Sequence, residues 1–350
     1  MNEGLFLLPA TVLFTLLIVL GWRLLPGERY QMLASVPVAR HDATHWHGVN
    51  FTWYGVLTAS SVTIALLFVL ILSASSGAAL GPVLAVLLLT VGLCLPAARL
   101  VARWVEKKRY TFTIGGAFFM GLAAMPLIIL LVNGGCLLLH VPPLQMPVMM
   151  AAIGIGYILG EGVGRMACVS FGCCYGNPLT QCAPLIGRLC NRLAFVFTVA
   201  TKKAVYEGNL AGIKLVPVQG LTCGLYTATA LFACHLFLQG HYHSAFLLSL
   251  VVSQVWRVLS ETLRADFRGF TTISSYQKMG GAAIVYGCGL SLLLPTPLMP
   301  LPDIARGLSL VCNPLLILGL QLLWCVIFFL FGRSMVTRSF LSFAVRHERI

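Results

Sequence analysis

Nine predominantly apolar runs, each roughly 20 residues long, constrain this fold more than any other feature. They cover approximately residues 5–25, 53–73, 79–99, 114–140, 148–164, 217–238, 245–263, 279–294 and 310–331. A helix of that length crosses the hydrocarbon core of a bilayer, and in lipid the backbone must satisfy its own hydrogen bonds. The runs are continuously apolar, whereas strands of a membrane barrel alternate apolar and polar residues. The sequence therefore predicts an all-α, polytopic integral membrane helix bundle with about nine transmembrane helices, forming one membrane domain over residues 1–350.

The chain is strongly basic, with 23 Lys and Arg against 10 Asp and Glu. A nucleic-acid-binding protein would gather this charge on one soluble face, but here it lies at helix ends and in loops, so we expect no nucleic-acid partner. When the predicted helices are followed in order, every Lys and Arg except Arg257 and Arg306 falls on one side of the membrane, called here the basic side. The positive-inside rule places this side in the cytoplasm. Arginines that bind lipid headgroups would, however, carry no information about orientation.

The segment GEGVGRMACVSFGCCYG, at residues 160–176, places charge at the end of an apolar run. Glu161 and Arg165 are four residues apart, so they share one face of a helix and can pair. Ionisable residues inside a membrane span are costly and usually functional. The alternative is a pair whose charged ends reach the membrane interface, and this stretch alone leaves both interpretations open.

A second charged segment, QVWRVLSETLRADFRG, occupies residues 254–269. The spacing predicts that Arg257, Glu261 and Arg264 lie on one helical face. Guanidinium groups suit phosphate because they offer planar pairs of donors and stay charged when desolvated. Taken alone, the segment slightly favours a buried pair between Arg257 and Glu261 that fixes helix register.

Cysteine and histidine clusters suggest metal binding only weakly. The residues 177–216 form the longest stretch without a full span, and we expect a small interfacial cap there. Cys173 and Cys174 precede this cap, and further cysteines, Cys182 and Cys190, lie within it. Adjacent cysteines bridge poorly, so the interpretation is packing of small residues, with a nucleophilic or redox role as the alternative. The short HDATHWH stretch offers too few ligands for a metal site, and a solvated interfacial loop is expected.

Several short elements, in this order and spacing, resemble the prolipoprotein diacylglyceryl transferase family over about residues 53–294. They are Tyr54-Gly55 at a helix start, the glycine-rich segment 113–121, Gly164-Arg165 followed by GCCYGNP, Pro217 with Gln219, the charged segment from Arg257 to Gly269, and Ser274–Gln277. The helices near each terminus are additions to the resembling region.

The resemblance implies a helical bundle open to lipid from the side, in a bacterial inner membrane. The implied activity is transfer of the diacylglyceryl group of phosphatidylglycerol, without any cofactor, to a cysteine thiol of a lipoprotein precursor. We predict that the residues carrying the lipid site fall into two groups. The catalytic group is Arg165, Arg257, Glu261 and Glu161, and the substrate-binding group is Tyr54, Gly115, Gly116, Gln219 and Arg264.

The sequence departs from the family where proton transfer would be expected. Ile114 stands where the family has a His before the paired glycines, and Cys168 stands where it has an Asn. Further departures are Val216, Leu221-Thr222 and Ser253. Since loss of a general base costs about 10²–10⁴-fold in rate, a replacement is needed, and the candidates are Glu161, Glu261, His41, His45 and His47. Two alternatives stay open, a non-catalytic phospholipid-binding or lipid-transporting protein and a small-molecule transporter.

Overall fold

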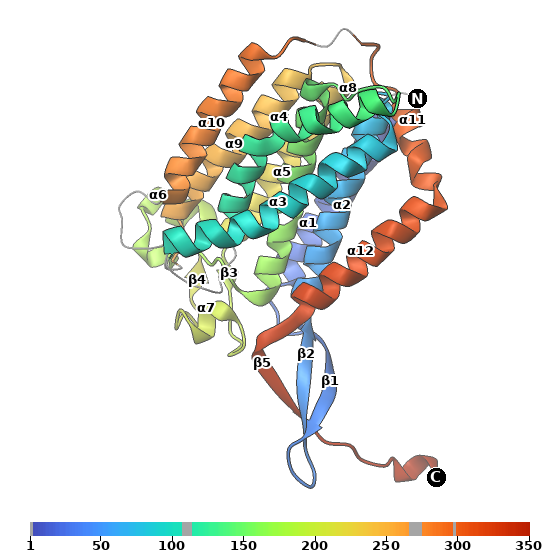
Figure 1. Cartoon of the computed structure of the whole chain (residues 1–350). Helices are drawn as coiled ribbons and strands as arrows, with labels where there is room; N and C mark the ends of the chain where they lie inside the picture. The colour runs from blue at the N-terminus through green and yellow to red at the C-terminus, as the bar shows by residue number, and fades with distance from the viewer. Residues whose placement is uncertain (1–2, 107–113, 266–274, 297–298) are drawn as a thin grey trace.

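The computed structural model describes residues 3–106, 114–265, 275–296 and 299–350, and it is a mostly helical membrane bundle (Figure 1). Each predicted run is a helix. The long helices are α1 (Gly4–Leu24), α2 (Trp53–Ser75), α3 (Leu80–Glu106), α4 (Ile114–Leu138), α5 (Met146–Phe171), α8 (Val218–Leu238), α9 (Tyr242–Thr262), α10 (Ser275–Leu293) and α12 (Pro314–Gly332).

Among the described residues, seven of these helices are long and apolar enough to cross a membrane. The other two are α9 and α10, so the expected count of about nine spans is corrected to seven by this criterion. The physical reason is composition, since α9 carries Arg257 and Glu261 and α10 begins with the polar sequence SYQK. These two helices pack beside the apolar ones within the bundle.

Helix α5 is the centre of the bundle. It packs against α2, α8 and α9. In the most apolar part of α5, 67% of the residues are buried, compared with 6% in α1 and in α12. Small residues allow this close packing. A Cβ atom at Gly156, for example, would lie 2.9 Å from the carbonyl oxygen of Ala65 in α2. This central helix also carries most of the first charged segment, which begins at Gly160.

A small antiparallel sheet projects from one end of the bundle (Figure 1). Its strands are β1 (Met32–Arg40), β2 (Trp46–Thr52) and β5 (Arg333–Leu341), in the order β1-β2-β5. A solvated loop was expected around the histidine-rich stretch, because apolar runs of spanning length do not reveal short strands. The strands are shorter than a span. β1 and β2 form a local hairpin, and the pairing of β2 with β5 joins segments far apart in the chain, which no local pattern indicates.

A compact cap, formed by the chain that connects α5 to α8, lies at the same end of the bundle (Figure 1). It contains η1 (Leu179–Gln181), α6 (Pro184–Cys190), β3 (Phe195–Val196), α7 (Lys203–Tyr206) and β4 (Lys214–Leu215). Its own core includes the buried side chains of Phe195, Phe197 and Leu215. The remaining elements are α11 (Ile304–Ser309), η2 (Leu310–Cys312) and η3 (His347–Arg349). The division of the chain into one membrane domain with a cap at 177–216 stays a prediction.

Candidate active site

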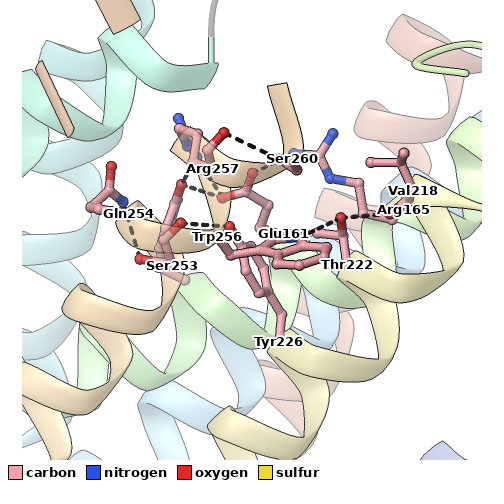
Figure 2. A network of polar contacts seen from close by, with 11 residues as sticks. Glu161, Arg165, Val218, Thr222, Tyr226, Ser253, Gln254, Trp256, Arg257 and Ser260 are labelled. Carbon is pink, nitrogen blue, oxygen red and sulfur yellow. Dashed lines mark hydrogen bonds and ion pairs between the residues drawn. The ribbon is translucent and has the colours of Figure 1, made fainter. Parts of the chain in front are cut away.

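Three side chains on successive turns of α5 meet an arginine from α9. Tyr157, Glu161 and Arg165 are spaced by four residues, so they follow one face of the helix. Nη2 of Arg165 donates to Oε1 of Glu161 at 2.5 Å, and Nη2 of Arg257 donates to Oε2 of the same carboxylate at 2.7 Å. The Tyr157 hydroxyl donates to Oε2 as well and accepts from Nη2 of Arg257 at 2.6 Å. Figure 2 shows Glu161 between the two arginines.

The cluster carries a net positive charge inside the bundle. Its ion pairs join two cations to one carboxylate, and the exposed fractions of the side chains are 4% for Glu161, 13% for Arg257 and 18% for Arg165. The Nε atoms of both arginines are buried without a hydrogen-bond partner. Buried charges that are incompletely compensated cost several kcal/mol, and buried donors normally have acceptors. The arrangement is therefore suited to receive an anion.

Helix α4 packs against the guanidinium of Arg257. A Cβ atom at Gly115 would lie 2.9 Å from Nη1 of Arg257, so a larger residue there would displace the guanidinium from its present position. The same guanidinium lies 5.9 Å from the centre of the Phe118 ring, within cation–π range. Gly116 is buried beside Gly115. The glycine-rich segment thus brings the backbone of α4 against the charged cluster.

Hydrogen bonds between α8 and α9 fix the helix that carries Arg257. The Tyr226 hydroxyl donates to the carbonyl oxygen of Ser253 at 2.7 Å, and Nε1 of Trp256 donates to Oγ1 of Thr222 at 2.8 Å (Figure 2). In α9, both bonds end on residues within about one helical turn of Arg257. They hold α9 in the rotation that points the guanidinium at Glu161.

An apolar cavity of about 400 Å³ adjoins the cluster. Its lining comes from α2, α3, α4, α5 and α9, and it includes Phe118, Gly121, Met125, Leu250 and Tyr157. Tyr157 therefore contacts the ion cluster with its hydroxyl and lines the cavity with its ring. A charged site beside apolar space of this size fits a ligand with a polar head and an apolar tail.

The other predicted residues lie around this centre at varying distance. Tyr54 stands at the start of α2 with its ring 5.9 Å from that of Phe171. Nε2 of Gln219 donates to the carbonyl oxygen of Cys173 at 2.8 Å, which ties α8 to the turn after α5. Glu261 is half-buried on the last turn of α9.

The second charged segment differs from its prediction in two ways. Helix α9 ends at Thr262, so Arg264 does not share a helical face with Arg257; its backbone instead forms a bridge with Gly176. The ion pair of Arg257 is with Glu161. The predicted residues Asp266, Arg268 and Gly269, together with Ser274, lie outside the described part of the chain.

The thiols of Cys168, Cys173 and Cys174 form a cluster that the sequence analysis grouped differently. Their sulfur atoms lie within 4.8 Å of one another. Hydrogen bonds from Cys168 and Cys173, and then the charges of Arg264 and Arg165, lower the pKa of the Cys174 thiol well below its usual value. Cys182 lies apart and bonds the carbonyl oxygen of Pro178 at 3.5 Å.

The histidine-rich stretch lies far from the charged cluster. It forms the turn between β1 and β2, at the end of the sheet that points away from the bundle (Figure 1). Asp42 organises this turn by accepting from the amides of Thr44 and His45, both at 2.7 Å, and the Thr44 bond is the main cause of its lowered pKa. His41, His45 and His47 are therefore not placed to replace the family's general base.

Sequence reasoning missed Tyr157 of the ion cluster and Cys168 of the thiol cluster. Tyr157 precedes Glu161 by four residues, so the same periodicity that paired Glu161 with Arg165 would have found it. Cys168 was noted only as a departure from the family pattern. Its proximity to Cys173 depends on the chain reversing direction at Gly172, where φ is +72°.

Comparison with known proteins identifies the family of this chain. Residues 42–293 match the family described as prolipoprotein diacylglyceryl transferase, which confirms the resemblance expected from the short motifs. A search of curated proteins found no match. The match covers more than half of the chain, including all four residues of the ion cluster. The chain therefore belongs to the prolipoprotein diacylglyceryl transferase family, multi-pass membrane enzymes that transfer the diacylglyceryl group of phosphatidylglycerol to a prolipoprotein cysteine.

Proposed function

We propose that Arg165 and Arg257 together bind the phosphodiester of a phosphatidylglycerol-like donor in this enzyme. The observation that carries this proposal is the sharing of one carboxylate by two buried guanidiniums. The cluster keeps one net positive charge and two buried Nε–H donors without partners, and a phosphodiester carries one negative charge. Guanidinium is also the side chain whose donor geometry matches phosphate oxygens.

The apolar cavity supports the same orientation of the donor. Its lining residues are apolar or small, and Tyr157 is shared between cavity and cluster. A lipid with its phosphate at Arg257 can extend an acyl chain into this space, where burial of each methylene group contributes about 0.8 kcal/mol. The donor would thus be held at both ends of its reactive glyceryl group.

The reaction itself calls for stabilisation of negative charge. The acceptor sulfur attacks the glyceryl carbon, a C–S bond forms, and the C–O bond to phosphate breaks. The leaving glycerol phosphate gains one negative charge, and preorganised cations stabilise this change more than they stabilise the ground state. Two arginines already fixed by Glu161 meet this requirement.

The other predicted residues would support these two arginines. Glu161 keeps the guanidiniums in place while no lipid is bound, and Gly115 gives Arg257 its space. Gly116 lies beside it, and Glu261 orients the outer part of α9. The remaining substrate-binding residues, at the end of α5 facing the cap, are Tyr54, Gln219 and Arg264.

The proposed location is a bacterial inner membrane, with the site near the basic side. The positive-inside rule assigns that side to the cytoplasm, whereas an exported prolipoprotein would be presented on the opposite side. A reporter fused after Arg349 decides between these orientations. An external C-terminus supports a prolipoprotein acceptor, and a cytoplasmic C-terminus supports an acceptor thiol presented inside the cell.

The test of the lipid site is release of glycerol phosphate by purified protein. The assay supplies headgroup-labelled phosphatidylglycerol vesicles and a prolipoprotein peptide containing its acceptor cysteine. We expect release by the native protein and by the control Arg306→Gln, which changes an exposed arginine of α11. Arg165→Gln should release about 10²–10³-fold less. Equal release by Arg165→Gln and the control would contradict the proposed phosphate site.

A further inference from the structure

Three thiols converge where α5 ends and the chain turns toward the cap. Cys168 is on the last turn of α5, and Cys173 and Cys174 follow Gly172. The three sulfur atoms lie within 4.8 Å of one another, and Cys168 is buried while the other two are partly exposed. With Zn–S bonds of about 2.3 Å, three thiolates around one zinc ion stand roughly 4 Å apart. The observed cluster therefore needs little rearrangement to close on a single ion.

The backbone around the cluster is fixed rather than free to relax. Gly172 ends α5 in the left-handed region at φ +72°, and Cys174 itself has φ +56°, which is unusual for a residue with a side chain. Nε2 of Gln219 holds the carbonyl oxygen of Cys173, and Nζ of Lys202 holds that of Ser170 at 2.6 Å. These bonds hold the backbone on both sides of Gly172 and so restrict where the three thiols can move.

The surrounding charges match a thiolate complex. Three thiolates and Zn²⁺ leave one net negative charge, and two arginines lie nearby. Arg165 precedes Cys168 by three residues on α5, and the backbone of Arg264 forms a bridge with Gly176 just after Cys174. A disulfide explains the geometry less well, because adjacent cysteines bridge poorly and a third thiol would remain. Among the described residues, this is the group of potential ligands that lies close enough to hold one ion, and it provides three of them.

We propose that Cys168, Cys173 and Cys174 bind one Zn²⁺ ion and leave its fourth position open for the acceptor thiol. Structural zinc sites use four protein ligands, whereas catalytic sites keep one position for water or substrate. The metal-binding part of this inference stands on the thiols alone. The role of the open position rests on the proposed function.

Zinc would supply the step for which the family's His is missing. A thiol that coordinates the ion loses its proton to water, so no general base is required. The bound sulfur then attacks the glyceryl carbon of the donor, and the C–O electron pair leaves with glycerol phosphate next to Arg165. The thioether product carries no charge and is a weak ligand, so it would leave the ion and restore the open position. Carbon, sulfur and charge balance without any oxidant or reductant.

The metal arm of the test uses the native sequence. Protein purified under reducing conditions is stripped with a chelator, divided, reloaded with Zn²⁺ or left empty, and alkylated before peptide mass spectrometry. We expect zinc to protect Cys168, Cys173 and Cys174, while Cys182 in the same tryptic stretch and the exposed Cys312 and Cys325 react equally in both samples. Equal alkylation of all cysteines with and without zinc would overturn the inference.

A matched pair of variants and an activity assay complete the test. Cys174→Ser should lose the bound zinc measured by elemental analysis, and Cys182→Ser should keep about one ion per chain. Glycerol phosphate release should fall by about 10²–10⁴-fold in stripped protein and return when zinc is added. Full activity of stripped protein would overturn the open-position role and leave the lipid site intact. Zinc binding with no release by any form would instead contradict the proposed function.

Discussion

Two groups of buried cations in this molecule differ in how their charge is compensated. Lys202 in the cap is fully buried, and its ammonium donates to the carbonyl oxygens of Leu25 at 3.0 Å and Ser170 at 2.6 Å. Burial lowers its pKa to about 8. These bonds join the ends of α1 and α5 to the cap, in a region packed with buried side chains. Lys202 therefore serves as a closed structural contact.

The charges of Arg165 and Arg257 are compensated less completely. They share one carboxylate, retain buried donors without partners, and lie beside an apolar cavity. Burial of a cation alone therefore does not indicate function. Excess charge, unused donors and adjacent space together distinguish a site that awaits a ligand from a contact that is already satisfied.

The largest expected effect follows removal of the shared carboxylate. Glu161→Gln keeps the shape of the side chain but leaves two buried guanidiniums without a counter-charge. Because breaking a buried pair typically costs about 3–5 kcal/mol, we expect a clear loss of thermal stability in detergent. Vesicles containing phosphatidylglycerol should recover more of the melting temperature in this variant than in the native protein, because the lipid phosphate replaces the lost charge.

The control for this prediction is Glu207→Gln, which breaks an exposed pair with Lys203 at 3.1 Å. Exposed pairs contribute little, so its melting temperature should stay close to that of the native protein. Equal stability of Glu161→Gln and this control would remove the contrast between the two kinds of buried cation.

Arg257→Lys is expected to have the next largest effect. A lysine keeps the charge but loses the planar donors that contact Glu161 and Tyr157. We expect kcat/KM for glycerol phosphate release to fall by about 10²–10³-fold in protein that remains folded. Lys202→Met, measured beside it in protein that remains folded, should keep most of its activity. The reverse result, an active Arg257→Lys and a folded but inactive Lys202→Met, would invert the comparison.

The sequence predicted the helices well because hydrophobic runs of spanning length are a strong signal. Helix α5 shows where this signal stops. Its apolar run ends at about Gly164, but the helix continues to Phe171, and Met166 and Val169 in this last part pack against the core of the cap. The hairpin β1-β2 was missed because its strands are shorter than a span, and β5 was missed because its pairing with β2 joins distant segments.

The site was predictable only within single helices. The pairing of Glu161 with Arg165 follows from spacing along α5, and the structure contains it. The contact between Glu161 and Arg257 depends on how α5 and α9 pack, which no periodicity reports, and the family resemblance alone suggested that Arg165 and Arg257 act together. The thiol cluster depends on the turn at Gly172, so the sequence placed Cys173 and Cys174 but not their neighbour Cys168.

The pH dependence of stability tests whether buried Lys202 is a structural contact. The unfolded chain binds a proton on Lys202 up to its ordinary pKa of 10.5, whereas the folded chain releases it near pH 8. Between these values the unfolded state holds more protons, so the free energy of unfolding rises with pH, by up to about 3 kcal/mol. We expect the melting temperature of Lys202→Met to lack this contribution between pH 8 and 10.5. Lys203→Met should keep it, and matching pH profiles of the two variants would refute the assignment.

The smallest expected effect tests whether the space beside the arginines holds lipid. Ala117 lines the apolar cavity, and Ala117→Phe would fill part of it without changing a charge. A displaced acyl chain should lower kcat/KM for long-chain phosphatidylglycerol by about 10-fold. A short-chain analogue, which reaches the phosphate site without filling the cavity, should be affected less. Ala282→Phe, at an exposed position of α10, serves as the control for added bulk. If both lipids lose activity equally in Ala117→Phe, the cavity matters for packing of α4 rather than for the tail of the donor, and the arginine pair alone defines the site.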